Sequence, residues 1–272
     1  MKKFRSFRKY STTVKLGIQE AMEYRIDFLF GLINGSFSVF IQFFLWTAIY
    51  GGSDSAVLYN YSYPQMIVYI IMAGILRRIT TTDFEYEIAD DIREGSLSRF
   101  LVQPIGYFPY RVFLFLGRKI LQFAVIILLS GVILTTLYFT MGAEFQLVNI
   151  LATFVVVPLS LLLNCVMFYC ISMTAFWLTR SWGVFNGMQV VTMVLSGGVF
   201  PLDVFGEPVK AVLMHLPFQF IVYFPLNIIC GNTNGSEIIY GIIAQIFWIV
   251  VVYLLSRILW RAGMKKYIAA GG

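Results

Sequence analysis

Long apolar runs alternate with short polar connections along the chain, and this pattern predicts helices that cross a membrane. A helix needs about 20 mainly apolar residues to cross a hydrocarbon core about 30 Å thick. Several runs reach that length, and none shows the strict apolar and polar alternation of barrel strands. Only helices and closed barrels satisfy their backbone hydrogen bonds in lipid, so the pattern favours helices. We predict six spans, at residues 28–50, 64–83, 119–139, 148–178, 184–204 and 238–259.

The composition agrees with this fold class, an all-α integral membrane protein with a single transmembrane domain over residues 1–272. Hydrophobic residues make up 59% of the chain and charged residues only 12%, and the mean hydropathy of +0.79 is well above that of ordinary soluble domains. With both termini in the cytoplasm, every Lys and Arg except Lys210 lies on the inner side, as the positive-inside rule favours. The net charge of +6 therefore indicates orientation and attraction to anionic membrane lipid, and we expect no nucleic acid partner.

Two further segments are expected to lie at the membrane surfaces. Residues 1–27 carry apolar side chains near one helical face, which suits a helix along the inner interface, although a solvated basic tail fits the same residues. Residues 201–235 are too apolar for an ordinary loop, yet their four prolines leave no uninterrupted run of about 20 residues. We expect a re-entrant hairpin of short helices there, in the outer leaflet.

The second predicted span carries two arginines, Arg77 and Arg78, which lie in the inner leaflet if the helix begins at Pro64. In one interpretation both side chains extend to the lipid phosphates and fix the topology. In the other, one arginine faces a neighbouring helix or a cavity, because adjacent residues on a helix point about 100° apart. That arginine would attract an anionic head group or cargo.

The longest polar connection, residues 84–104, predicts two short helices separated by a break. One apolar stripe recurs every fourth residue, at Phe84, Ile88 and Ile92. Gly95 can adopt the left-handed conformation that ends a helix, and Ser96 can cap the next one. We expect the charged residues of this segment to face water or a partner: Asp90, Asp91, Arg93, Glu94 and Arg99. An ordinary solvated connector is the competing interpretation.

The chain carries little of the chemistry that an enzyme or an ion-coupled carrier needs. It has one histidine, His215, and no phosphate-binding G-x-x-x-x-G-K-[ST] motif. Its three cysteines have no metal-ligand spacing, and the apolar parts of the last four spans contain no acidic residue for ion coupling. We therefore expect no catalytic site and no metal, and we expect a separate ATPase to supply the energy for transport.

Three motifs are similar to those of one family of membrane proteins. The first follows the second span and fits I-x-x-G-x-L-x-x-x-L-x-x-P, at Ile92, Gly95, Leu97, Leu101 and Pro104. The second comprises Phe200-Pro201-Leu202, Leu216-Pro217-Phe218, Pro225 and Gly231, and the third is the tail WRAGMKKYIAAGG at residues 260–272. On these motifs the chain resembles the membrane subunits of ATP-binding-cassette exporters of the type-two permease superfamily, in the subgroup of small paired permeases.

The resemblance implies the partners and the location of the chain. A separate ATP-binding-cassette ATPase subunit would bind the cytoplasmic connection. That subunit would also hold the ATP and Mg²⁺, so this chain would carry no cofactor. A second permease, identical or a sister chain, would complete the path. The location would be the plasma membrane, the inner membrane in a bacterium, with membrane lipid around the spans. The competing function is a stand-alone secondary carrier or channel.

The resemblance also assigns roles to particular residues. Those expected to couple to the ATPase are Asp91, Arg93, Glu94, Gly95, Leu97 and Arg99. Those expected to line the translocation path are Arg77, Arg78, Asn186, Gln189 and Ser196. The last three also fit an alternative role as polar contacts between helices, because a packed helix interface uses the same i, i+3 and i+7 spacings.

Overall fold

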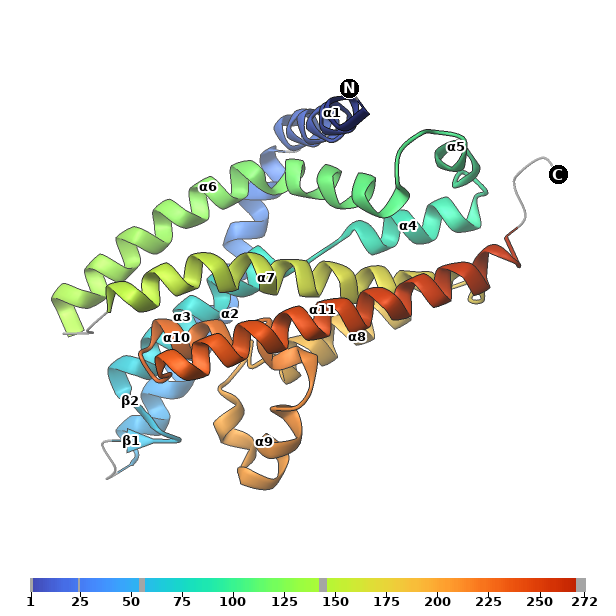
Figure 1. The fold of residues 1–272 in the computed structure, drawn as a ribbon. Helices are drawn as coiled ribbons and strands as arrows, with labels where there is room; N and C mark the ends of the chain where they lie inside the picture. The colour runs from blue at the N-terminus through green and yellow to red at the C-terminus, as the bar shows by residue number, and fades with distance from the viewer. Residues whose placement is uncertain (1, 24, 54–56, 142–145, 268–272) are drawn as a thin grey trace.

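The computed structural model describes residues 2–23, 25–53, 57–141 and 146–267, and helices dominate this part of the chain (Figure 1). Two long helices, α7 (Leu147–Ser172) and α11 (Gly235–Met264), pack against each other along the centre. A short 3₁₀ helix, η1 (Met173–Phe176), continues α7. The longest helix, α6 (Tyr107–Met141), packs against α3 (Tyr63–Thr80) and carries α1 (Lys2–Glu23) on its other side.

The second helix of the chain, α2 (Arg25–Gly51), packs on α3 and is joined to it by a small hairpin of two-residue strands. These strands, β1 (Val57–Leu58) and β2 (Tyr61–Ser62), are antiparallel and are the one departure from an all-helical fold in the described chain. Tyr59 and Asn60 make the turn with positive φ angles of 52° and 68°. The Gln65 side chain then accepts a hydrogen bond from the Ser62 amide and closes the first turn of α3.

Helix α3 ends at Thr80, short of the predicted boundary at residue 83, and the chain then enters α4 (Phe84–Arg93) and α5 (Ser98–Leu101). Helix α6 begins at Tyr107, well before the predicted span at residue 119, so its first turns belong to the same polar end of the molecule as α4 (Figure 1). The predicted spans at residues 148–178 and 238–259 correspond to α7 with η1 and to α11.

The predicted fifth span, residues 184–204, is wrong in its second half. Helix α8 (Trp182–Leu195) ends before Ser196, because Gly197 has a φ of +78° and cannot continue a right-handed helix. The Gly197 carbonyl accepts a hydrogen bond from the Tyr69 hydroxyl at 2.8 Å, so α3 holds this turn. The Tyr223 amide donates to the Ser196 carbonyl at 2.8 Å and holds it from the other side.

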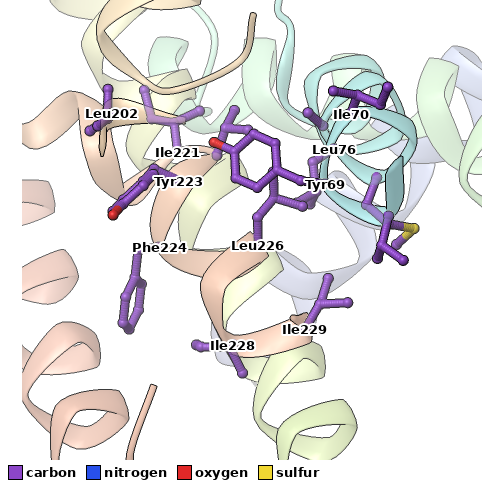
Figure 2. Close-up of a cluster of buried hydrophobic side chains, with 14 of the residues drawn as sticks. Tyr69, Ile70, Leu76, Leu202, Ile221, Tyr223, Phe224, Leu226, Ile228 and Ile229 are labelled. Carbon is purple, nitrogen blue, oxygen red and sulfur yellow. The ribbon is translucent and has the colours of Figure 1, made fainter. Parts of the chain in front are cut away.

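Short helices fill the proline-rich segment between α8 and α11, as the sequence predicted. They are η2 (Leu202–Phe205), α9 (Glu207–Leu213), η3 (Pro217–Phe220) and α10 (Tyr223–Ile229). Helix α10 is almost entirely buried and packs on α7 and α3. Figure 2 shows this core, in which Leu226 and Tyr223 of α10 approach Tyr69 and Leu76 of α3. The segment is therefore part of the folded core as well as a surface hairpin.

By length and composition, two helical stretches in the described chain are able to cross a membrane, Val148–Phe176 and Gly235–Met264. A third is available if the two halves of α6, Tyr107–Ile120 and Gln122–Ile133, form one span with a bend of 50°. Shorter apolar stretches occur at Phe37–Gly51 and Trp182–Leu195. Large apolar side chains on α2, α6, α7 and α11 are exposed, which suits helices that face lipid or a partner in a membrane.

Helix α1 crosses α6 with backbones in contact. A Cβ atom on Gly17 would lie 2.3 Å from the Leu114 carbonyl oxygen, and one on Gly117 would lie 2.4 Å from the Val14 carbonyl oxygen. Only glycine allows this approach. The expected amphipathic helix at the amino terminus is therefore a helix, as predicted, and it is fixed to α6.

Candidate functional site

The polar connection between α3 and α6 folds as a compact unit, residues 84–104, which we call the knob. Its apolar stripe is buried as predicted, with Phe84 and Ile88 fully enclosed and Ile92 nearly so. The Phe84 ring packs edge-on against Phe115 of α6 with centroids 5.4 Å apart, and α4 also packs against α7 and η1. The knob is thus seated on the membrane helices by its apolar face.

The break between α4 and α5 has the geometry that the sequence predicted at Gly95, whose φ is +71°. Ser96 does not cap α5, because α5 begins at Ser98 and the Ser96 hydroxyl lies 2.8 Å from a carboxylate oxygen of Asp91. Tyr267 closes the turn: its hydroxyl donates to the Gly95 carbonyl at 2.6 Å and accepts from the Ser98 amide at 3.0 Å. Sequence reasoning missed Tyr267 because it lies far away, near the end of the chain.

Asp91 is the main correction to the expected coupling residues, because it does not face water. It is 7% exposed and forms an ion pair with Arg111 of α6. It also accepts hydrogen bonds from the Tyr107 and Ser96 hydroxyls. Leu97 is likewise fully buried. These two residues hold the knob together and offer no surface to a partner.

Ion pairs extend from the knob to α1. Arg111 also pairs with Glu87, one turn before Asp91 on α4. Glu87 pairs in addition with Arg118, which lies two turns after Arg111 on α6. The Arg118 guanidinium is 3.9 Å from a carboxylate oxygen of Glu20 on α1. One network therefore joins α1, α4 and α6.

Three of the predicted coupling residues do remain on the surface of the knob, and we call Arg93, Glu94 and Arg99 the rim. Arg93 pairs with Asp90 and donates to the Thr179 carbonyl at 3.0 Å. A cleft of about 280 Å³ opens beside Arg93, between the knob and the segment that follows η1. The rim therefore presents both signs of charge next to a concave surface.

A second feature lies at the end of α3, between α7 and α8. It is a cavity of about 410 Å³, which we call the polar cavity. Its principal polar lining residues are Arg77, Asn164, Asn186, Gln189, Thr192 and Ser196, together with Thr80, Thr81 and Thr82 after the turn of α3. The cavity brings together four of the five residues predicted to line a path.

The fifth, Arg78, does not line this cavity. Its carbonyl oxygen accepts a hydrogen bond from the Lys119 side chain of α6 at 3.1 Å, whereas Arg77 lies on the cavity side of α3. Of the two arginines, only Arg77 lines this cavity, which agrees with the 100° step between adjacent residues on a helix. The prediction that Arg78 lines a path gains no support from this cavity.

Two hydrogen bonds connect the knob to the wall of the polar cavity. The Gln189 side-chain amide donates to Glu85 at 3.0 Å, and the Tyr86 hydroxyl donates to the Asn186 amide oxygen at 2.8 Å. Glu85 is fully buried, and burial raises the pKa of its carboxyl. Asn186 and Gln189 therefore act as contacts between helices and as lining residues together. Their spacing of three residues was the one available signal, and it gave no indication of their partners on α4.

The described residues show no group of three or more His, Cys, Asp and Glu side chains that could hold a metal ion. His215 is exposed, and its ring Nδ1 lies 2.8 Å from the Ala211 carbonyl oxygen within α9 and the turn after it.

A comparison with known protein families places most of the chain in one of them. Residues 37–271 match the family described as "ABC-2 family transporter protein". A comparison with curated proteins gave no match.

The buried ion pair between Arg111 and Asp91 leads to a prediction about stability. Arg111→Met leaves Asp91 charged and unpaired in the interior, and we expect the free energy of unfolding to fall by about 3 to 5 kcal/mol. The double variant Arg111→Met/Asp91→Leu removes both charges, and we expect it to be more stable than Arg111→Met alone. Denaturation of the purified chain in detergent measures both.

Arg93→Met is the matched control, because it breaks an ion pair whose side chains are 38% and 53% exposed. We expect it to cost less than about 1 kcal/mol. Equal losses for Arg93→Met and Arg111→Met would contradict a structural role for the buried network.

Proposed function

The chain belongs to the ABC-2 family of transporter proteins, and on that premise we propose that the rim of the knob is where its ATPase docks. Such a chain is the integral membrane subunit of an ATP-driven transporter and has no nucleotide site of its own, since a separate ATPase hydrolyses the ATP. Family membership thus decides against a stand-alone carrier. The observation that carries the docking proposal is a charged rim on a buried base that is ion-paired to α6 and, through Arg118 of α6, linked to α1.

A docking element has to transmit force, and the contacts of the knob are suited to this. Because Arg111 and Arg118 tie α4 to α6 and α1, a push on the rim moves these elements together. The hydrogen bonds from Glu85 and Tyr86 continue to α8, which forms one wall of the polar cavity. A displaced knob therefore changes the shape of the cavity through α8.

We propose that the polar cavity is part of the translocation path and that a second permease completes the path. A polar chamber between apolar helices is costly to maintain in a membrane, and polar residues at such positions mark transport pathways. The apolar faces of α2 and α8 are exposed, with Phe44, Trp182 and Val190 on the surface, and they offer an area that a second permease could cover.

For the membrane orientation we propose six spans with both termini in the cytoplasm. The spans are α2, α3, α6, α7 with η1, α8, and α11, with the knob inside and residues 201–235 at the outer surface. Helices α3 and α8 are the shorter spans in this arrangement, and the buried α10 packs on α3. Support comes from the basic residues, of which only Lys210 falls on the outer side.

The orientation has a direct test. In a chain whose three native cysteines are replaced by alanine, single cysteines are placed at Glu207 in α9 and at Val102 in the knob, both strongly exposed. An impermeant thiol reagent added to intact cells should label position 207 and leave 102 unlabelled until the membrane is opened. Labelling of position 102 in intact cells would contradict the proposed orientation, because it would place the knob on the outer side.

Docking is tested by reversing a charge on the rim. Glu94→Lys should lower the amount of ATPase that co-purifies with the permease by about tenfold or more, because a misplaced charge at an interface costs several kcal/mol. The control is Glu207→Lys, the same change at an exposed site on the opposite end of the molecule. Both variants should insert and purify normally. Normal ATPase recovery with Glu94→Lys, or equal losses in both, would falsify docking at the rim.

A further inference from the structure

The polar cavity contains one charge, and that charge has no partner. Of the residues that line it, all within the described chain, Arg77 alone is ionisable at neutral pH. No described carboxylate forms an ion pair with Arg77, and its guanidinium makes no hydrogen bond to any described residue. By contrast, Arg111 and Arg118 are each paired with acidic side chains. Arg78, the next residue, also forms no ion pair in the described chain, but it does not line the cavity.

The acidic groups near the cavity do not neutralise Arg77. Asp83 is largely exposed, and its carboxylate lies 3.7 Å from the Arg118 guanidinium, so it pairs with Arg118 and not with Arg77. Glu85 faces Gln189 on the other side of the cavity wall, and burial raises the pKa of its carboxyl and so disfavours its charged form. The chamber as a whole therefore keeps a positive potential.

Arg77 is half-buried at the wall of this cavity, so an anionic partner there would offset the partial loss of its hydration. Moving a charge out of water without a partner is strongly unfavourable, and the arginine side chain forms paired hydrogen bonds with carboxylate and phosphate groups. Neutral polar groups surround it: Asn186 and Gln189 expose side-chain amides, and the Thr192 hydroxyl has no partner among the described residues. These groups complement the oxygen atoms of an anionic head group.

The remaining wall of the cavity is apolar and comes from Phe168, Val190, Met193, Ile221 and Val222. The cavity volume of about 410 Å³ lies within the range of small-molecule sites. The site therefore has room for a charged head group and the first part of an apolar body.

We propose that the polar cavity binds the anionic head group of an amphipathic cargo, with Arg77 as the residue that recognises the charge. This inference rests on the proposed function, in which the cavity belongs to the translocation path. The recognised chemistry is a phosphate or carboxylate attached to an apolar chain. Arg78 takes no part, because it lies outside the cavity.

The test measures binding of radiolabelled dodecyl phosphate to the full-length chain, purified in a neutral detergent. We expect saturable binding that Arg77→Gln weakens by about 10-fold to 100-fold, the loss of a hydrogen bond to a charged group. Arg78→Gln, the same substitution at the adjacent residue, should bind as the unmodified chain does. Arg77→Lys keeps the charge and should lose less affinity than Arg77→Gln. Equal binding by the two glutamine variants would overturn the proposal.

Competition separates the possible sources of the anion. An excess of unlabelled dodecyl phosphate should displace the probe, whereas inorganic phosphate and dodecanol at the same concentration should not. Displacement by inorganic phosphate would show a site for a free anion, and displacement by dodecanol would show a site for an apolar chain. Either result would overturn the amphipathic assignment. Because no ATPase is present, a failure here is distinct from a failure of docking at the rim, and thermal unfolding of each variant confirms that it is folded.

Discussion

The buried guanidinium of Arg111, held between Glu87 and Asp91, is the interaction on which the arrangement of α4 and α6 depends. Separating this cation from its partners would leave charges unpaired in the interior, at a cost of several kcal/mol. Helix α4 therefore cannot leave α6 without a large loss of stability. Arg118 extends the same constraint to α1, whose backbone also meets α6 at Gly17. Three helices from separate parts of the chain behave as one unit.

If the ATPase docks on the rim as proposed, this unit would give it a rigid surface and would transmit movement towards the membrane helices. The rim is charged and exposed, whereas the base beneath it is apolar and ion-paired, so docking and anchoring use different residues of the same short segment. The connection between α4 and α8 is weaker, because it consists of two hydrogen bonds: Gln189 donates to Glu85, and Tyr86 donates to Asn186. Because the knob is held more strongly to α6 than to α8, the wall of the polar cavity formed by α8 is free to move relative to α6.

The sequence revealed the features that depend on local patterns. Apolar runs predicted the long helices, the four-residue repeat predicted the buried face of α4, and Gly95 predicted the break after it. The features that it could not reveal depend on residues distant in the chain. Nothing local distinguishes Asp91 from an exposed carboxylate, because its partner is on α6, and nothing in the tail marks Tyr267 as the residue that closes the Gly95 turn. The early end of α8 was missed because a span predicted from average hydropathy takes no account of a single glycine, here Gly197 with its positive φ angle.

The central claim is that the knob and α6 move as one body while α8 moves relative to them. Spin labels at Val102 in the knob and at Leu128 on the exposed face of α6 report this distance in the complex with the ATPase. Labels at Val102 and Val190 report the distance from the knob to α8. The account predicts that trapping ATP leaves the first distance distribution unchanged and shifts the second. A shift in the distance between Val102 and Leu128 would contradict it.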